Sequence, residues 1–343
     1  MTNISSGKVI VTGGAGYIGS HAVKRLLKEG YDVCVFDNFS TGFRQALENL
    51  KKYGNLEVEE VDLSDIDALR KVFSTNSFAD VSTVLHFAGA LVVSESMTNP
   101  RKYFINNLSG TVNLLECMKD CGISNIVFSS TCAVYGNSKY VPLDENHPVS
   151  PTNPYSESKL MVEKALKWYS EIFGVKHLIF RYFNVFGADP DLDIGYSSNP
   201  STHLVPNAVK GALGIESFKV TCATNFPTKD GTPVRDYVDV NDLADAHFKA
   251  VGYLQSGKSG EIVNLGTGKG YSVYEIIDIV EKVTGAKIDR AKGEARSGEY
   301  SEVYANYDKA AQLLGWSPVT TLEDGVRNLV AWFEKYPNGY PNS

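Results

Sequence analysis

The 343-residue sequence predicts an α/β protein with a doubly wound parallel sheet and a smaller carboxyl-terminal α/β domain. Two observations predict this fold class. In the first half, short runs rich in β-branched residues alternate with longer amphipathic stretches, and the short runs are apolar on both faces. A glycine-rich turn joins the first of these runs to the first amphipathic stretch, as in Rossmann-like folds.

The elements follow in order along the chain. Strands are expected at 8–13, 32–37, 56–63, 81–89, 125–130 and 177–187, and helices at 20–30, 66–73, 106–119 and 155–173. Residues 189–202 are rich in Asp, Gly, Ser, Asn and Pro, which is typical of a loop. Further helices are expected at 241–254 and 273–284. We therefore predict a first domain over 1–187 and a second over 188–343, with parts of 234–266 packing back on the first.

Composition and charge limit the possible partners. The formal net charge is −7 and the basic residues are scattered, which argues against nucleic acid and anionic membranes as partners. The longest apolar run, 84–93, is too short to span a bilayer. Five cysteines without a CxxC pair indicate a reducing compartment, and Cys117 and Cys121 have no neighbouring histidine to complete a metal site. A cytoplasmic protein with a small ligand and no metal is expected.

The turn VIVTGGAGYIGSH has the spacing of a dinucleotide-binding site. Gly13, Gly16 and Gly19 let the backbone approach a pyrophosphate, and the following helix N-terminus offers N–H groups. Asp37, at the end of the second strand, can accept a hydrogen bond from a ribose 2′-hydroxyl and would repel a 2′-phosphate. The pattern favours NAD over NADP, although Arg44 is near. The second glycine cluster, 264–272, lacks such an acid and is expected to be a turn.

A tyrosine and a lysine in PYSESK form the candidate catalytic pair. Tyr155 and Lys159 are four residues apart, and so lie on the same face of the expected helix. A phenol has a reference pKa near 10, and a nearby ammonium favours the phenolate. The hydroxyls of Ser129, Ser130 and Thr131 end the strand before this helix. Ligands of parallel sheets bind at that end of the strands.

Six motifs together resemble the extended short-chain dehydrogenase/reductase family, and within it the 4-epimerases of UDP-sugars. They are TGGAGYIGSH, SSTCAVYG, PYSESKLMVE, RYFNVFGA, DGTPVRDYVDVNDLADAH and NLGTGKG. The similarity runs from about residue 8 to about residue 318. It implies that NAD stays bound, that the substrate is UDP-glucose or UDP-galactose, and that the protein forms a homodimer.

The resemblance also implies a mechanism. Tyr155 takes the proton of the sugar's 4-hydroxyl as hydride leaves C4 for NAD, Thr131 shares that hydroxyl, and Lys159 holds the nicotinamide ribose. The resulting 4-keto sugar turns its other face to the cofactor, and hydride returns to it.

Further site residues carry over from the family's motifs. The implied cofactor-binding residues are Gly13, Gly16, Tyr17, Ile18, Gly19, Asp37, Asn38, Asp62, Leu63, Phe87, Ala88, Gly89, Asn106, Ser129, Tyr155, Lys159 and Phe183. The implied substrate-binding residues are Thr131, Tyr155, Asn184, His203, Leu204, Arg235, Arg296, Glu299 and Val303. Among these, Asn184 is expected at the diphosphate, Arg235 and Arg296 at phosphate and ribose, and Glu299 at the ribose.

Two small residues separate the alternatives within the family. The similar 4,6-dehydratases carry Asp-Glu where this chain has Cys132 and Ala133, and the related decarboxylases carry Glu at the Ala133 position. Neither Cys132 nor Ala133 can supply that acid, so epimerisation is favoured over elimination. A nucleotide-sugar oxidoreductase and a non-catalytic NAD-binding protein remain as alternatives. The latter class is expected to lack the Tyr–Lys pair.

Three positions depart from the family's pattern. Leu91 stands where some epimerases have a lysine, and Cys222 where many members have a phenylalanine that stacks on uracil. Val303 aligns with the residue that gates the sugar pocket, although an offset of one would place Glu302 or Tyr304 there. A small gate predicts that UDP-GlcNAc and UDP-GalNAc are also substrates. Epimerisation of a UDP-pentose or UDP-uronate stays open.

Overall fold

The computed structural model describes residues 7–75, 78–197, 201–295 and 300–340, which form two compact units. The first unit comprises the chain up to Gly136 together with Val149–Arg181 and Ala244–Val263. The second comprises Asn137–Pro148, Tyr182–Leu243 and the chain from Asn264 onward. The domain boundary at residue 187 stays a prediction.

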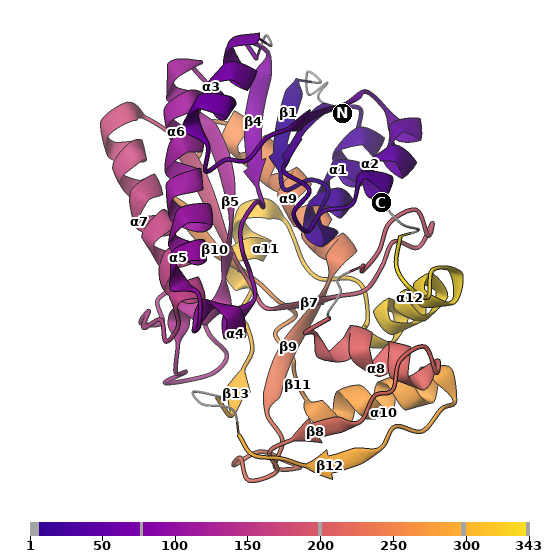
Figure 1. Ribbon diagram of the computed structural model, residues 1–343. Coiled ribbons are helices and arrows are strands. Elements are labelled where there is room, and N and C mark those ends of the chain that lie inside the picture. The colour runs from indigo at the N-terminus through magenta and orange to yellow at the C-terminus, as the bar shows by residue number, and fades with distance from the viewer. Residues whose placement is uncertain (1–6, 76–77, 198–200, 296–299, 341–343) are drawn as a thin grey trace. The chain divides into compact units, whose positions relative to one another are not determined.

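A seven-stranded sheet forms the centre of the first unit, which confirms the predicted fold class (Figure 1). The strand order is β10-β6-β5-β4-β1-β2-β3. The bounds are β1 Lys8–Thr12, β2 Asp32–Asp37, β3 Leu56–Glu60, β4 Val81–His86, β5 Asn125–Thr131, β6 Lys176–Tyr182 and β10 Glu261–Leu265. Strands β1 to β5 pair in parallel. All five residues of β1 are buried, as expected for a central strand covered on both faces.

Helices cover both faces of this sheet. On one face, α3 (Ile66–Thr75), α6 (Gly110–Asp120) and α7 (Pro154–Phe173) pack on the side chains of Ile10, Phe36, Ile126 and Phe128. On the other face lie α1 (Tyr17–Lys28) and α9 (Val240–Gln255), joined by an Arg25–Asp245 ion pair of 3.0 Å. Short helices complete the unit: α2 Arg44–Leu50, η1 Lys51–Tyr53, α4 Val93–Ser96, α5 Pro100–Tyr103, η2 Phe104–Ser109 and η3 Cys132–Tyr135.

Local sequence fixes both ends of α7, the helix that carries the Tyr–Lys pair. The Asn153 side chain accepts a hydrogen bond from the Ser156 N–H, and Pro154 occupies the first turn, where its missing N–H costs nothing. Gly174 ends the helix in the left-handed region, with φ of 72°. Tyr155 therefore lies in the first turn of a helix with a fixed start.

The second unit contains two small sheets and four helices within the described residues. Strands β7 (Asn184–Phe186), β9 (Val234–Asp239), β11 (Gly270–Ser272) and β13 (Glu302–Val303) form one sheet, and β8 (Val220–Cys222) pairs with β12 (Arg290–Lys292). The helices are α8 Leu204–Ala212, α10 Val273–Thr284, α11 Asp308–Leu314 and α12 Leu322–Lys335. The run 177–187, expected as one strand, is split at Phe183 into β6 and β7, which belong to different sheets.

Candidate active site

The predicted nucleotide turn lies between β1 and α1, and its glycines are required sterically. Gly13 has φ of +70°, and a Cβ there would lie 2.7 Å from the Ala88 nitrogen. A Cβ on Gly19 would lie 2.2 Å from the carbonyl oxygen of Gly13. At Gly16, by contrast, a Cβ would meet only that same oxygen, at 3.2 Å. The backbone at Gly16 is thus open to a ligand.

Helix α1 begins at this opening without a competing cap. Gly16 is its N-cap residue, no side chain caps it, and the first turn contains no acid. Tyr17, Ile18 and Gly19 form that first turn, and Tyr17 and Ile18 are half-buried. The positive end of the helix dipole and a backbone without Cβ atoms fit the pyrophosphate of a dinucleotide.

Asp37 ends β2 beside this turn and is buried. Its two carboxylate oxygens accept hydrogen bonds from the Ala15 N–H at 2.9 Å and the Phe39 N–H at 2.8 Å. Burial raises its pKa above the usual aspartate value, and these two bonds oppose the rise. A carboxylate has about four acceptor positions, so Asp37 retains capacity for a ribose hydroxyl. Arg44 forms an ion pair with Glu60 of 2.5 Å, and its charge also acts to lower the pKa of Asp37.

Asp62 and Asn38 lie together after the neighbouring strands. The Asn38 amide donates to Asp62 at 2.9 Å, and Ser64 donates to the other Asp62 oxygen from its N–H and hydroxyl. Burial acts to raise the pKa of Asp62, but these hydrogen bonds lower it below the usual value. Leu63, the next residue, is buried. The group forms a polar edge with an adjoining apolar surface, which suits an adenosine.

Residues 87–89 follow β4 and turn toward the catalytic helix. The N–H groups of Phe87 and Ala88 both donate to the Thr12 carbonyl, at 3.0 and 3.1 Å. A Cβ on Gly89 would lie 2.8 Å from the Asn107 side-chain oxygen and 3.5 Å from the Lys159 ammonium nitrogen. Gly89 therefore lies against both side chains.

Asn107, which is not among the residues predicted from the sequence, holds this turn. Its side chain accepts from the Ala90 N–H at 2.7 Å and donates to the Ala90 carbonyl and to Ser158. The side chain of Asn106 instead bonds back to the Lys102 carbonyl, at 2.8 Å. Both lie in the π-helix η2, whose wider turn shifts side chains from their α-helical positions. The two consecutive asparagines in the sequence FINNLS are the signal from which Asn107 could have been predicted.

Thr131, Tyr155 and Lys159 converge at the end of β5. Thr131 is the last residue of the strand, and its side chain is hydrogen-bonded to that of Tyr155. The Lys159 ammonium donates to the Ser129 carbonyl at 2.9 Å and lies 4.9 Å from the centre of the Phe128 ring. Tyr155 is half-buried, and Tyr103 packs edge-to-face on it with 6.3 Å between ring centres. The predicted catalytic pair and hydroxyl thus form one cluster.

Burial dominates the acid–base properties of this cluster. It raises the pKa of Tyr155 to about 12, against an opposing hydrogen bond from Thr131. It lowers the pKa of Lys159 to about 8, an effect that Glu163 opposes. It also lowers the pKa of His86 to about 3, so His86 is neutral and hydrogen-bonds Thr12 and Thr111. Additional positive charge near Tyr155 would favour its phenolate.

The second unit holds the remaining described candidates. Asn184 begins β7 and pairs with Tyr237, whereas Arg235 pairs with Val303 across β9 and β13. Asn184 and Arg235 are half-buried and Val303 is buried. Phe183 is buried, and its N–H donates to the Leu265 carbonyl.

His203 and Leu204 lie at the start of α8. The His203 ring bonds the Tyr196 hydroxyl at 2.8 Å, and burial lowers its pKa. Arg296 and Glu299 lie outside the described residues.

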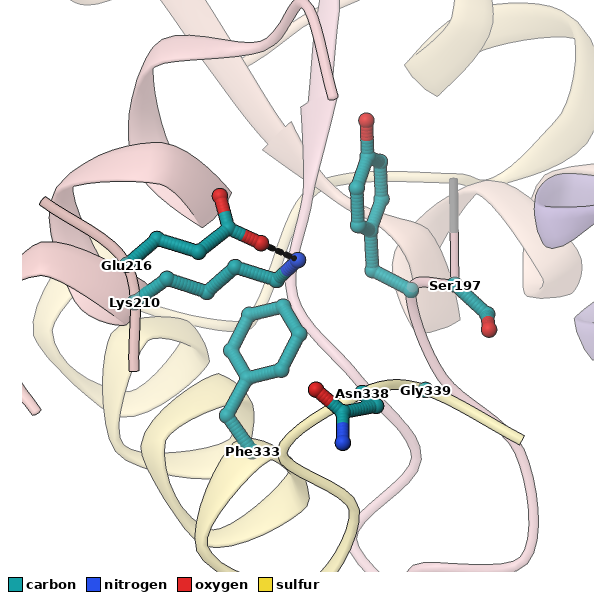
Figure 2. A pocket seen from close by; sticks show the side chains of 7 residues that line it. Ser197, Lys210, Glu216, Phe333, Asn338 and Gly339 are labelled. Carbon is teal, nitrogen blue, oxygen red and sulfur yellow. Dashed lines mark hydrogen bonds and ion pairs between the residues drawn. The ribbon is translucent and has the colours of Figure 1, made fainter. Parts of the chain in front are cut away.

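Two other features of the second unit lie apart from the predicted residues. A cavity of about 60 Å³, enough for a few water molecules, is lined by Tyr196, Ser197, Lys210, Glu216, Phe333, Asn338 and Gly339 (Figure 2). The Lys210 ammonium is paired with Glu216 at 2.6 Å and points over the Phe333 ring. The carboxylates of Asp189, Asp191 and Asp193 also gather within 4.8 Å of one another. None of these residues was a sequence candidate.

The parallel sheet, glycine turn and Tyr–Lys helix define the class of Rossmann-fold NAD-binding proteins with a tyrosine–lysine pair. The chain matches the NAD dependent epimerase/dehydratase family over residues 9–266, and it belongs to that family. It is 43% identical to the UDP-glucose 4-epimerase of Lacticaseibacillus casei over 97% of this chain and 98% of that protein.

Solved structures agree with this assignment. The UDP-glucose 4-epimerase from Bifidobacterium longum, in complex with NAD+ and UDP, superposes with a TM-score of 0.91 and 36% identity, covering 97% of this chain and all of that one. The UDP-Glc/GlcNAc 4-epimerase from Campylobacter jejuni gives a TM-score of 0.83 and 36% identity over 96% of this chain and 99% of that one. The family resemblance inferred from the motifs is therefore confirmed.

Proposed function

We propose that this protein is an NAD-dependent 4-epimerase of UDP-sugars, acting on UDP-glucose and UDP-galactose through a transient 4-keto sugar. The observation that carries the proposal is the Thr131–Tyr155–Lys159 cluster at the end of β5, in a chain whose relatives are UDP-glucose 4-epimerases. The open glycine turn fits NAD, and Asp37 favours it over NADP.

The chain's residues orient the substrate and move one proton. The chemistry that NAD supplies when bound is reversible oxidation at C4. Tyr155 removes the 4-hydroxyl proton and later returns it. Thr131, whose side chain is hydrogen-bonded to Tyr155, orients the same hydroxyl of the sugar. Lys159 binds the nicotinamide ribose, and its charge favours the tyrosinate. Asn107 fixes the Gly89 turn beside Lys159.

The residues after Thr131 favour epimerisation over dehydration. Cys132 and Ala133 follow the strand in η3, and the Ala133 N–H donates to the Thr131 hydroxyl at 3.2 Å. Neither side chain is a carboxylic acid, which elimination of a hydroxyl needs. Epimerisation requires only the base and the cofactor.

The nucleotide half of the substrate is assigned to the second unit. We place the diphosphate at Asn184, phosphate and ribose at Arg235 and Arg296, and the ribose also at Glu299. His203 and Leu204 are also assigned to the substrate, whereas Phe183 is assigned to the cofactor. Cys222 in β8 interacts with Tyr274 and offers no aromatic face to a base. The uracil is therefore bound without stacking on an aromatic side chain at position 222.

Val303 extends the proposal to N-acetylated sugars. It is a small side chain on β13 beside Arg235, and a related structure from Campylobacter jejuni is a UDP-Glc/GlcNAc 4-epimerase. We expect the protein to convert UDP-GalNAc to UDP-GlcNAc, which chromatography of the reaction products measures. Val303→Tyr should abolish this conversion and leave the epimerisation of UDP-glucose intact. If Val303→Tyr spares both reactions and Tyr304→Ala changes the selectivity, the gate is Tyr304 instead.

Location and assembly complete the proposal. In the parts of the chain that the structure describes, every helix is too short or too polar to cross a membrane. We assign the protein to the cytoplasm, as its cysteine usage indicates, and propose that it forms a homodimer. Helix α7 supports the dimer with an apolar stripe of Met161, Ala165, Trp168 and Ile172, of which Trp168 is 61% and Ile172 is 64% exposed.

Purified protein incubated with UDP-glucose tests the activity. The proposal predicts UDP-galactose by chromatography, an equilibrium reached from either side, and no net change in free NAD or NADH. Stoichiometric NADH would indicate an oxidoreductase, and NAD release on denaturation without any conversion would indicate a binding protein. A UDP-pentose and a UDP-uronate in parallel reactions define the substrate range.

A further inference from the structure

Three consecutive residues of β5 are bonded to three residues of α7 spaced one turn apart. The side chain of Thr131 bonds Tyr155, the hydroxyl of Ser130 donates to Glu163 at 2.5 Å, and the carbonyl of Ser129 accepts from Lys159 at 2.9 Å. We call this set the strand–helix ladder. Two of its rungs hold the catalytic pair, whereas the rung through Glu163 contacts no group that the mechanism uses.

Glu163 is a buried carboxylate with a single charged partner among the described contacts, Arg181 on β6. The Arg181 guanidinium donates twice to Glu163, at 3.0 and 2.5 Å, and both side chains are 4% exposed. The guanidinium also lies over the Tyr135 ring, at 4.7 Å. A buried pair is weak evidence for stability, because apolar residues often replace such pairs without loss. A role in the neighbouring site explains it better.

Glu163 is one turn from Lys159 on the same helix, where side chains i and i+4 are neighbours. In the buried surroundings, water screens this interaction poorly. Glu163 acts on Lys159 to raise its pKa, against burial, which lowers it. Among the described residues, the other titratable group that interacts with Lys159 is the neutral His86 on β4. Glu163 is therefore the acidic group that favours the charged ammonium.

We propose that Glu163 is a positioning residue of the epimerase site, which supplies a buried negative charge one helical turn from Lys159 and fixes the end of β5 through Ser130. This inference rests on the proposed function. Glu163 touches neither sugar nor cofactor and acts through Lys159. Arg181 neutralises the charge of the Glu163 carboxylate. The side chains of Lys159, Glu163 and Arg181 together therefore carry one net positive charge at the base of the site.

Removing either partner of the Glu163–Arg181 pair separates this role from a structural one. Both Glu163→Gln and Arg181→Gln break the pair and lower Tm. Glu163→Gln leaves two unopposed cations and lowers the pKa of Lys159 by about one unit or more, whereas Arg181→Gln leaves an unopposed carboxylate and raises it. Glu171→Gln removes an exposed carboxylate from the same helix and should leave Lys159 unchanged.

The measurement is NMR titration of the cofactor-free protein labelled at lysine Cε, with the Lys159 signal assigned by its absence in Lys159→Met. Shifts of opposite sign in the two variants support the proposal. Shifts of equal sign, or none, overturn it and leave the pair a structural contact. This readout needs no turnover, so it stays valid even where the wild-type protein fails to epimerise any UDP-sugar.

Kinetics provide the second readout. Glu163→Gln should lower kcat about twofold at pH 7 and close to tenfold at pH 9, with less than a twofold change in KM, because the loss shrinks as pH falls and Lys159 regains its proton. Glu163→Asp, which keeps the charge, should restore most of the rate. A pH-independent loss, or a loss in Glu163→Asp as large as in Glu163→Gln, contradicts the proposed role.

Discussion

Burial shifts the pKa values of the two central side chains of the site away from their usual values, in opposite directions. It raises the pKa of Tyr155 to about 12 and lowers the pKa of Lys159 to about 8. At neutral pH the protein alone thus holds a neutral phenol beside a charged ammonium. In the proposed mechanism Tyr155 would become an effective base only with the positive charge of the oxidised nicotinamide next to it, which would tie proton removal to the presence of NAD+.

Tyr155→Phe tests the base directly. Without the phenolic oxygen no group is placed to take the 4-hydroxyl proton, and we expect kcat to fall by about 10²- to 10⁴-fold. The ring and its packing on Tyr103 remain, so Tm and the NAD released on denaturation should not change. Tyr169→Phe is the matched control, because Tyr169 lies on the same helix and its hydroxyl bonds Glu116. Residual turnover near the wild-type rate would assign the base elsewhere.

The depressed pKa of Lys159 makes stability depend on pH. Between about pH 8 and 10.5 the unfolded chain binds more protons at this position than the folded one, so folding gains stability as pH rises. The difference between wild type and Lys159→Met in cofactor-free protein isolates this contribution, which reaches at most about 3.4 kcal/mol for 2.5 pH units. Urea unfolding across this range measures it. A difference that does not change with pH contradicts the assigned pKa.

At the scale of elements, the turn from β1 to α1 separates two kinds of glycine. A Cβ on Gly19 collides with backbone, at 2.2 Å from the Gly13 oxygen, so Gly19→Ala should destabilise the fold by about 1–3 kcal/mol. A Cβ on Gly16 meets little protein, so Gly16→Ala should keep Tm near wild type and weaken NAD binding about tenfold or more. Thermal unfolding and NAD titration distinguish them. Equal losses of stability would mean that Gly16 has only a structural role.

The element scale also shows what the sequence could predict. Periodicity and turn residues sufficed for the sheet of the first unit, the glycine turn and the long helix from Tyr155 to Phe173, since these are local signals. The sequence could not show that Asn107 lies against Gly89, because this depends on the π-helix η2, a local change in helical pitch without a sequence pattern. The break at Phe183, which moves β7 to another sheet, depends on pairing with β9, distant in sequence.

At the scale of the whole molecule, the chain crosses between its two units several times. Residues 137–148 leave the first unit and 244–263 return to it. The hydrogen bonds of Leu143 with Tyr304 and Asn306 show why the segment 137–148 belongs to the second unit. Such long-range pairing has no signature in local composition. The site residues proposed within 84–93 and 128–136, by contrast, could be predicted from the local sequence, because ligands of parallel sheets bind at the ends of the strands.

The apolar stripe on α7 predicts the assembly. We expect sedimentation equilibrium to give the mass of two chains for wild type and of one chain for the double variant Trp168→Glu, Ile172→Glu, because two buried charges oppose an apolar interface. Val319→Glu introduces the same charge at an apolar residue that is 80% exposed in the second unit, and it should remain dimeric. Loss of the dimer should also lower Tm, because the apolar area buried in the interface no longer stabilises the folded chains. A double variant that stays dimeric would place the interface on another surface, and a monomeric wild type would contradict the dimer itself.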